Sequence, residues 1–192
     1  MIYAPHPELD LTVSRIIKAP RSAVWNAWTE PASFQQWWVP APEVCRVQDM
    51  ELRPGGSFRT EISQDGIEFG RHITGCFLAV DELERIVFTD ALVAGWRPSD
   101  ASFVTAVITM RDHADGTEYS ATAMHRDIAD RDRHEQLGFH DGWGTVTRQL
   151  AELNQRPGRD LQIHGSARLA QSLLAAGLID EPRLPFTTEH SH

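Results

Sequence analysis

Two histidines, His72 and His125, have the residue type and the position that acid–base chemistry requires. Both lie in segments with the composition of strands, so either side chain can face the inside of a sheet. An imidazole beside an apolar pocket can act as a general base or orient a carbonyl group. The sequence supplies neither histidine with an acid–base partner, and a strand histidine that faces solvent or makes one structural hydrogen bond is the favoured alternative. His72 and His125 therefore stand as catalytic candidates without an assigned role.

The remaining motifs argue against metal and nucleophilic chemistry. His134 and His140 are expected on different faces of a helix, and His190 and His192 belong to the terminal segment. A closed metal site draws on three or four converging ligands, so we predict no metal. There is no Gly-x-Ser-x-Gly elbow and no P-loop, and we predict no cofactor.

Aromatic side chains are the more informative residues. Of the six tryptophans, Trp25 and Trp28 are expected in the core, whereas four others can reach a cavity or its lid. Large flat side chains with one polar group suit a ring-containing or acyl ligand, although packing in the core is an equal alternative. The candidate ligand-binding residues are Trp37, Trp38, Phe58, His72, Trp96, Phe103, Phe139 and Trp143.

The elements that must position these residues follow from hydrophobic periodicity and from turn residues. A first strand is expected over 9–17, followed by two short helices, the second containing residues 34–38. Residues 93–102 are expected to form a mobile loop. Apolar residues at helical spacing predict one long amphipathic helix over about 130–154. Six further strands are expected over 44–52, 55–62, 70–80, 85–90, 103–111 and 117–125.

Three glycines interrupt the predicted long helix, and each costs about 1 kcal/mol of helix stability relative to alanine. Gly138, Gly142 and Gly144 either bring the helix close to the strands or leave volume for a ligand beside Phe139 and Trp143. Alternatively, they mark a kink or the true start of the helix.

Composition limits the possible partners and the compartment. The 192 residues suffice for one domain and an appendage, and the net charge of -9 repels nucleic acid and anionic membrane surfaces. No segment resembles an export signal or a membrane span, so we expect a cytoplasmic protein. In that compartment Cys45 and Cys76 are expected as buried thiols rather than a disulfide.

The order of strand, two short helices, six strands and long helix predicts an α+β domain with a curved antiparallel sheet wrapped around the last helix. Residues 9–155 resemble the START-like superfamily, also called SRPBCC, and within it the family named after the heat-shock-protein-ninety ATPase activator. The resemblance implies a helix-grip fold with a hydrophobic cavity between the long helix and the sheet. It is carried by residues 17–20 (IKAP), 24–29 (VWNAWT), 34–38 (FQQWW), 52–58 (LRPGGSF), 85–89 (RIVFT) and 138–143 (GFHDGW).

The tail has a different character, so we divide the chain into a START-like domain over 1–155 and an extension over 156–192. Residues 159–181 resemble an internal fragment of the bacterial reductase domain related to dihydrofolate reductase and found in riboflavin-pathway reductases. Gly165 and Ser166 match its phosphate-binding turn, but the other strands of that domain are absent, so NADPH binding is not expected. The expected helix carries an apolar stripe that can dock on its own domain or on a second copy, which suggests a homodimer.

Three functions remain open, because the fold does not determine function. The first is binding of a small hydrophobic or amphipathic molecule in the internal cavity. The second is a cyclase- or hydrolase-like enzyme that uses a pocket histidine, His72 or His125. The third is a protein-binding role like that of the co-chaperone relatives, for which an exposed apolar patch is expected.

Overall fold

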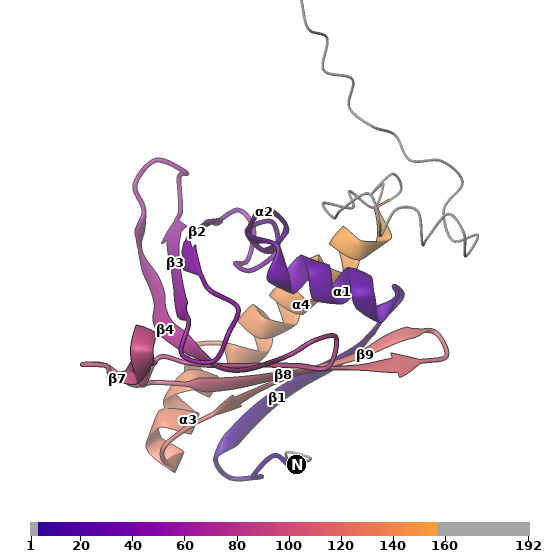
Figure 1. The fold of residues 1–192 in the computed structure, drawn as a ribbon. Coiled ribbons are helices and arrows are strands. Elements are labelled where there is room, and N and C mark those ends of the chain that lie inside the picture. The colour runs from indigo at the N-terminus through magenta and orange to yellow at the C-terminus, as the bar shows by residue number, and fades with distance from the viewer. Residues whose placement is uncertain (1–3, 157–192) are drawn as a thin grey trace, which may run out of the picture. The chain divides into compact units, whose positions relative to one another are not determined.

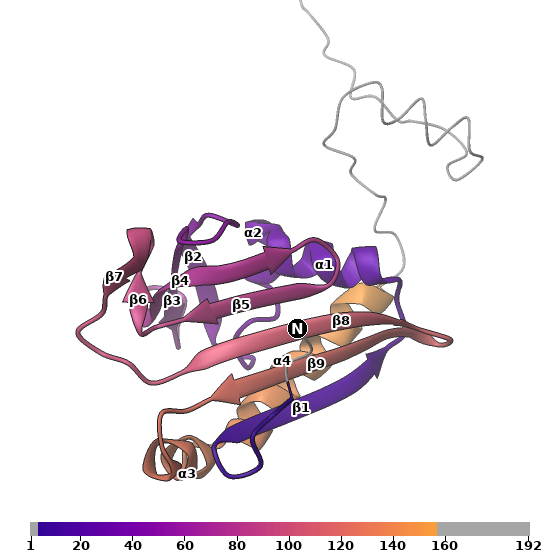
Figure 2. The same ribbon diagram turned by 60° about the horizontal axis from the view of Figure 1, so that its bottom comes forward.

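The computed structural model describes residues 4–156. Their centre is a seven-stranded antiparallel sheet in the order β1-β9-β8-β5-β4-β3-β2, which confirms the seven strands predicted from the sequence (Figures 1 and 2). The chain therefore runs along a meander from β2 to β9, and β1 closes the far edge beside β9. The strands are β1 (Asp10–Ile17), β2 (Val44–Met50), β3 (Ser57–Ser63), β4 (Gly70–Asp81), β5 (Arg85–Thr89), β8 (Thr105–His113) and β9 (Gly116–Met124).

Three of the helices lie on one face of this sheet. The two short helices are α1 (Arg21–Thr29) and α2 (Pro31–Phe34), and the long helix is α4 (Phe139–Gln155). Figure 2 shows α4 passing behind the strands, and Figure 1 shows α1 and α2 on the same side. The α+β helix-grip architecture expected from the sequence is therefore confirmed.

The hydrophobic core fills the space between the helices and the inner face of the sheet. Trp25 and Trp28 of α1 are buried as predicted, and Phe58, Phe77 and Phe88 come from three neighbouring strands. Full burial of one such side chain stabilises the fold by roughly 1.5–3 kcal/mol. Cys45 and Cys76 are buried free thiols, as the sequence analysis predicted.

The prediction of one long helix from about residue 130 is wrong. The chain forms α3 (Ile128–Gln136), breaks at Leu137 and Gly138, and begins α4 at Phe139. Gly138 has a φ of 91°, a left-handed conformation that ends one helix and precedes the next. An added Cβ at Gly142 or Gly144 would meet no atom within 4 Å, so these glycines do not serve close approach to the strands. Of the alternatives left open, Gly138 marks the true start of the helix.

The segment predicted as a loop over 93–102 contains regular structure. Strands β6 (Leu92–Val93) and β7 (Arg97–Pro98) pair around a 3-10 turn over Ala94–Trp96. This small hairpin docks on the turn that joins β2 to β3, where the N–H of Gly95 donates to the carbonyl of Gly55 at 2.9 Å. A Cβ at Gly55 would lie only 2.7 Å from the indole nitrogen of Trp96, so the contact requires glycine.

Candidate functional site

A pocket of about 150 Å³ lies between the first half of β4 and the segment that joins β5 to β8. We call it the β4–β5 pocket. Phe88 and Val104 give it apolar walls, while His72, Asp90 and Ser99 contribute polar groups. Apolar walls combined with hydrogen-bonding groups occur in small-molecule sites, and here about half of the lining residues are polar or charged. The complete lining is Arg71, His72, Ile73, Thr74, Phe88, Asp90, Val93, Ser99, Asp100, Ala101 and Val104.

A β-bulge in β4 places His72 at this pocket. Thr60 of β3 pairs with Ile73 and Glu61 pairs with Arg71, so His72 is the extra residue between two regular pairs. An extra residue breaks the strict alternation of side chains and can turn one towards the opposite face. The ring of His72 accordingly lies 6.3 Å from that of Trp38, which belongs to the core.

The imidazole of His72 is anchored by one hydrogen bond and is partly desolvated. Its Nδ1 lies 3.2 Å from the hydroxyl of Thr60, a residue that is almost fully buried. Although His72 as a whole keeps considerable exposed surface, the atoms around its ring desolvate the charged form and lower its pKa. His72 is therefore a neutral, oriented imidazole at pH 7.

Asp90 is positioned by the backbone at the end of β5. Its Oδ1 accepts hydrogen bonds from the N–H groups of Phe103 at 2.9 Å and Val104 at 3.0 Å. Both donors lie just before β8, so the carboxylate holds the returning chain against the end of β5. The bonds use only one of the two carboxylate oxygens, and Asp90 is one of the residues that line the pocket.

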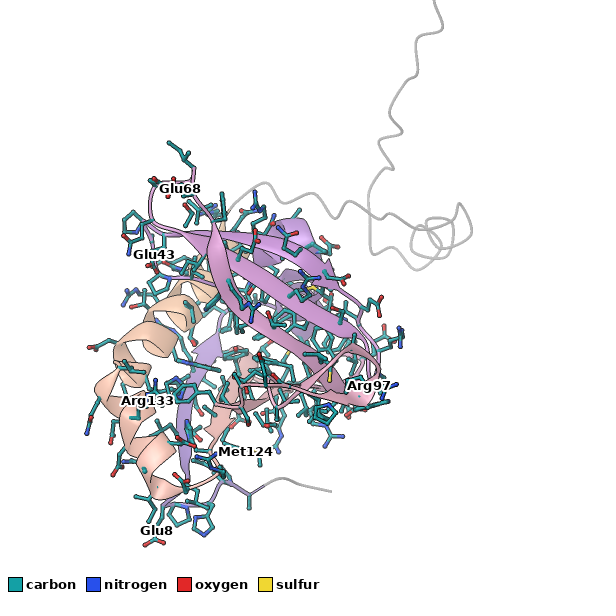
Figure 3. The ribbon with its side chains drawn as sticks, turned by 90° about the vertical axis from the view of Figure 1, so that its left-hand side faces the viewer. Glu8, Glu43, Glu68, Arg97, Met124 and Arg133 are labelled. Atoms are coloured by element: carbon teal, nitrogen blue, oxygen red, sulfur yellow. The ribbon has the colours of Figure 1, made fainter. Side chains whose placement is uncertain are left out.

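A second polar cluster lies at the end of the sheet beside α3. Nε2 of His125, just after β9, is 2.8 Å from Nδ1 of His134 on α3, and Nδ1 of His125 is 2.9 Å from the carbonyl of Leu9. Met124 and Arg133, the neighbours of these two histidines, lie at the same end of the molecule in Figure 3. The pair therefore joins the segment before β1, the end of β9 and helix α3.

When both imidazoles are uncharged, the hydrogen bonds assign their protons. A carbonyl only accepts, so Nδ1 of His125 carries a proton and its Nε2 accepts the Nδ1 proton of His134. Burial, together with the adjacent His125, lowers the pKa of His134 to about 4. Both effects oppose a charge on His134, so at neutral pH it is an uncharged link in this chain of hydrogen bonds.

Aromatic rings surround the His125–His134 pair and lead towards the core. The ring of His134 lies 5.0 Å from Phe103, 5.1 Å from Phe139 and 6.2 Å from Trp143. Trp143 is in turn 6.2 Å from Trp38. The inner face thus carries a continuous series of rings between the two histidine sites.

The structure brings together most of the side chains proposed for ligand binding from the sequence. Phe58, Trp38 and Trp143 form a connected aromatic group that also reaches His72, while Phe103 and Phe139 pack around His134. None of these aromatic residues belongs to the lining of the β4–β5 pocket, in which His72 is the one proposed contact.

The other two proposed residues differ in their burial. Trp37 packs against Trp38 inside the core, with ring centroids 5.6 Å apart, and its indole N–H donates to the carbonyl of Ala27 at 2.9 Å. Trp96 covers Gly55 on the β6–β7 hairpin and remains 49% exposed.

From the sequence, His134 was considered only as a metal ligand, and Asp90 was not singled out. His134 is nine residues from His125 and lies on a different element. The spacing of the two histidines along the sequence therefore does not predict that they pair. Asp90 had a usable signal, because it ends a predicted strand immediately before a segment already suspected of lying near the cavity. Acidic residues at such positions commonly bind the backbone of the following loop.

A larger hollow of about 560 Å³ lies on the outer face of the sheet. Its walls include Ser14 and Ser120, which alternate with the inward-facing Val13 and Ala121 of the same strands. Many of its charges are already paired, as in the 3.1 Å contact between Arg21 and Asp112. With neither histidine site in its lining, this hollow is the poorer candidate.

Within residues 4–156, no three histidine, cysteine or acidic side chains gather in a way that could hold a metal ion. None of the helices in the same range has the length and apolar character needed to cross a membrane. The tail segment over 159–181, with its resemblance to a reductase fragment, lies outside the described residues.

Comparison with known proteins places this geometry in a family. The family model described as "Activator of Hsp90 ATPase homolog 1-like protein" matches residues 18–155. A Nitrosomonas europaea protein of known crystal structure is 41% identical in sequence. The match has a TM-score of 0.71 and covers 78% of this chain and 96% of that one. A Chromobacterium violaceum protein is 26% identical, with a TM-score of 0.61 over 77% and 99% of the two chains.

More distant relatives share the fold alone. The AHSA1-like protein of Aeromonas hydrophila is 16% identical, with a TM-score of 0.55 over 92% of this chain and 100% of that one. No curated protein matches the chain. The extent of the family match, together with the helix-grip architecture, shows that the chain belongs to the Activator of Hsp90 ATPase homolog 1-like family.

Proposed function

We propose that this protein binds a small amphipathic molecule in the β4–β5 pocket. The observation that carries the proposal is the pocket's composition, with Phe88 and Val104 beside His72 and Asp90. Apolar walls supply affinity, and a few oriented polar groups supply specificity.

The volume limits the size of the ligand. The pocket measures about 150 Å³, and an apolar protein cavity of roughly that size holds a molecule as large as benzene. A single ring or a short acyl group fits this space, whereas a long-chain lipid requires a larger opening.

Native mass spectrometry of the purified full-length protein tests the proposal. We expect an added mass of small-molecule size that is lost on denaturation. The variant Ala101→Trp places an indole in the pocket lining and should abolish the added mass. Ala114→Trp, at an exposed position in the β8–β9 hairpin, is the matched control and should retain it.

The proposal fails if the wild-type protein carries no added mass and its melting temperature is unchanged by a panel of small amphipathic compounds. It also fails if Ala101→Trp binds like the wild type. The same spectrum counts subunits, and therefore tests the proposed homodimer.

An enzymatic role of the cyclase or hydrolase type is a second candidate, favoured by the hydrogen-bonded His125–His134 pair. A base oriented by another group is the usual arrangement for proton transfer. However, a pKa of about 4 makes His134 a poor base at neutral pH, since an efficient catalytic base has a pKa near the working pH. We therefore rank binding above catalysis.

A protein-binding role like that of co-chaperone relatives is the third candidate, and family membership is its main support. The large apolar side chains that are exposed within residues 4–156 come from several separate elements. They include Ile67 of the β3–β4 connection, Trp96 of the β6–β7 hairpin and Leu137 after α3. This distribution does not favour a single docking patch.

A further inference from the structure

We infer that the β4–β5 pocket selects an uncharged ring compound that carries a carbonyl oxygen beside an N–H or O–H group, and that it discriminates against carboxylates. The inference rests on the proposed function and specifies its ligand class. Its basis is the placement of one hydrogen-bond donor, His72, and one acceptor, Asp90, in the wall of the same small pocket.

The donor follows from the hydrogen bonds of Thr60. Its hydroxyl oxygen accepts the backbone N–H of Ile73 at 3.3 Å and lies 3.2 Å from Nδ1 of His72. If Nδ1 carried the proton, the hydroxyl proton of Thr60 would have no acceptor among the described residues, although Thr60 is only 1% exposed. A buried donor without a partner is strongly disfavoured. Thr60 therefore donates to Nδ1, and the proton of the neutral imidazole is on Nε2.

His72 thus offers an N–H group without a positive charge. Desolvation lowers its pKa, which keeps the imidazole neutral at pH 7. A neutral donor suits a carbonyl oxygen, whereas a carboxylate gains most from a cationic partner.

The acceptor is the second carboxylate oxygen of Asp90. Both backbone N–H groups bind Oδ1, and Oδ2 has no hydrogen-bond partner among residues 4–156. An ionised carboxylate can only accept hydrogen bonds, so a ligand beside Oδ2 must bring an N–H or O–H group. Phe103 and Val104 hold Asp90 in place through their backbones, and the acceptor therefore needs little reorganisation on binding.

The charges of the lining leave one net negative charge, which disfavours anionic ligands. Asp90 and Asp100 contribute two carboxylates, and Arg71 contributes one guanidinium group. The protein as a whole has a net charge of -9. A carboxylate ligand would enter a negative field beside an acceptor-only group, which is unfavourable.

Three six-membered ring probes of similar size separate these requirements. 2-Piperidone has a carbonyl oxygen beside an N–H group, cyclohexanone has the carbonyl only, and cyclohexanecarboxylate is an anion. Binding is measured by titrating each probe into ¹⁵N-labelled full-length protein and following the amide signals of Phe103 and Val104. We expect 2-piperidone to bind about tenfold tighter than cyclohexanone, because it adds a hydrogen bond to a charged group, and cyclohexanecarboxylate to bind weakest.

Two variants assign the effect to the named groups. Asp90→Asn keeps an oxygen for the two backbone N–H groups but replaces the other oxygen by an amide donor. This variant should remove the preference for 2-piperidone over cyclohexanone. His72→Phe should weaken both carbonyl compounds about tenfold. Ala101→Trp should eliminate all binding at this site.

The inference is overturned if the carboxylate binds as tightly as 2-piperidone, if the two carbonyl compounds bind equally, or if Asp90→Asn preserves their difference. In each of these cases the proposed function survives, provided that Ala101→Trp blocks binding. If no probe shifts these signals, or if Ala101→Trp leaves the shifts intact, the β4–β5 pocket is not the site and the proposed function fails as well.

Discussion

The indoles of Trp37 and Trp38 are both buried but have different polar surroundings. The N–H of Trp37 donates to the carbonyl of Ala27, whereas that of Trp38 has no hydrogen-bond partner among the described residues. Replacement by phenylalanine removes the same atoms at both positions. We expect Trp37→Phe to reduce the free energy of unfolding by about 1–2 kcal/mol more than Trp38→Phe, since only the first breaks a buried hydrogen bond. Urea unfolding of both variants measures the difference, and an equal or larger loss for Trp38→Phe contradicts this explanation.

His134 should make stability depend on acidity. Its pKa is about 4 in the folded protein, below the value of about 6.5 expected for an unfolded chain. Between these values the unfolded state binds more protons, so the free energy of unfolding decreases as the pH falls from about 6.5 to about 4. Allowing for the access of solvent to α3, we expect His134 to contribute a loss of about 1–2 kcal/mol.

Urea unfolding at several pH values across this range tests the assignment. His134→Phe keeps an aromatic ring beside Phe103 and Phe139 but cannot take up a proton, so its stability should decline less on acidification. His140→Gln, which changes an exposed imidazole at the start of α4, is the control and should follow the wild type. An unchanged slope for His134→Phe would show that other groups cause the acid sensitivity.

Single residues also show where prediction from sequence ends. The strand that contains His72 was predicted correctly, but the bulge that directs its ring towards Trp38 depends on pairing between β3 and β4. The pairing of His125 with His134 depends on where α3 returns to the sheet. Such contacts are properties of the tertiary arrangement, and residue spacing along the chain does not encode them.

At the scale of elements, the break between α3 and α4 provides a matched test. Gly138 has a positive φ, whereas Gly144 lies inside α4, where an added Cβ would meet no atom within 4 Å. Gly138→Ala should destabilise the protein by roughly 1–2 kcal/mol through backbone strain. Gly144→Ala should stabilise it by up to about 1 kcal/mol, because alanine favours the helix. Thermal unfolding compares the two variants. An unchanged melting temperature for Gly138→Ala would show that α3 and α4 tolerate a continuous helix.

The strands were easier to predict than this break. Turn residues such as Asp115 and Gly116 lie between apolar segments, and the β8–β9 hairpin follows directly. Leu137 misled the helix assignment, because its spacing continues the apolar stripe of α4 although the side chain is 68% exposed. Helical periodicity identifies a stripe of residues but does not reveal that two separate helices contribute to it.

Across the domain, the sheet order predicts unequal protection of the two buried thiols. Cys45 is on the edge strand β2, whereas Cys76 is on β4, which has neighbours on both sides. Burial raises the pKa of Cys45 to about 12 and also raises that of Cys76, so neither is a reactive thiolate in the folded state.

Labelling with dithionitrobenzoate tests this difference. We expect Cys45 to react first, through local opening of the edge strand, and Cys76 to react only at the rate of global unfolding. The variants Cys45→Ser and Cys76→Ser separate the two signals. Faster labelling of Cys76 in the native protein would contradict the expected order of protection.

The position of β1 beside β9 has a consequence for how the chain folds during synthesis. Asp10 pairs with Met124 and Ile17 pairs with Thr117, so β1 is made long before β9, its neighbour in the sheet. At a translation rate of about 5–20 residues per second, roughly 100 intervening residues delay this pairing by about 5–20 s. Ile17, which is fully buried in the finished fold, remains without its native environment during that interval. Closure of the sheet at β1 is therefore a late, long-range step, in which a nascent chain depends on protection from aggregation.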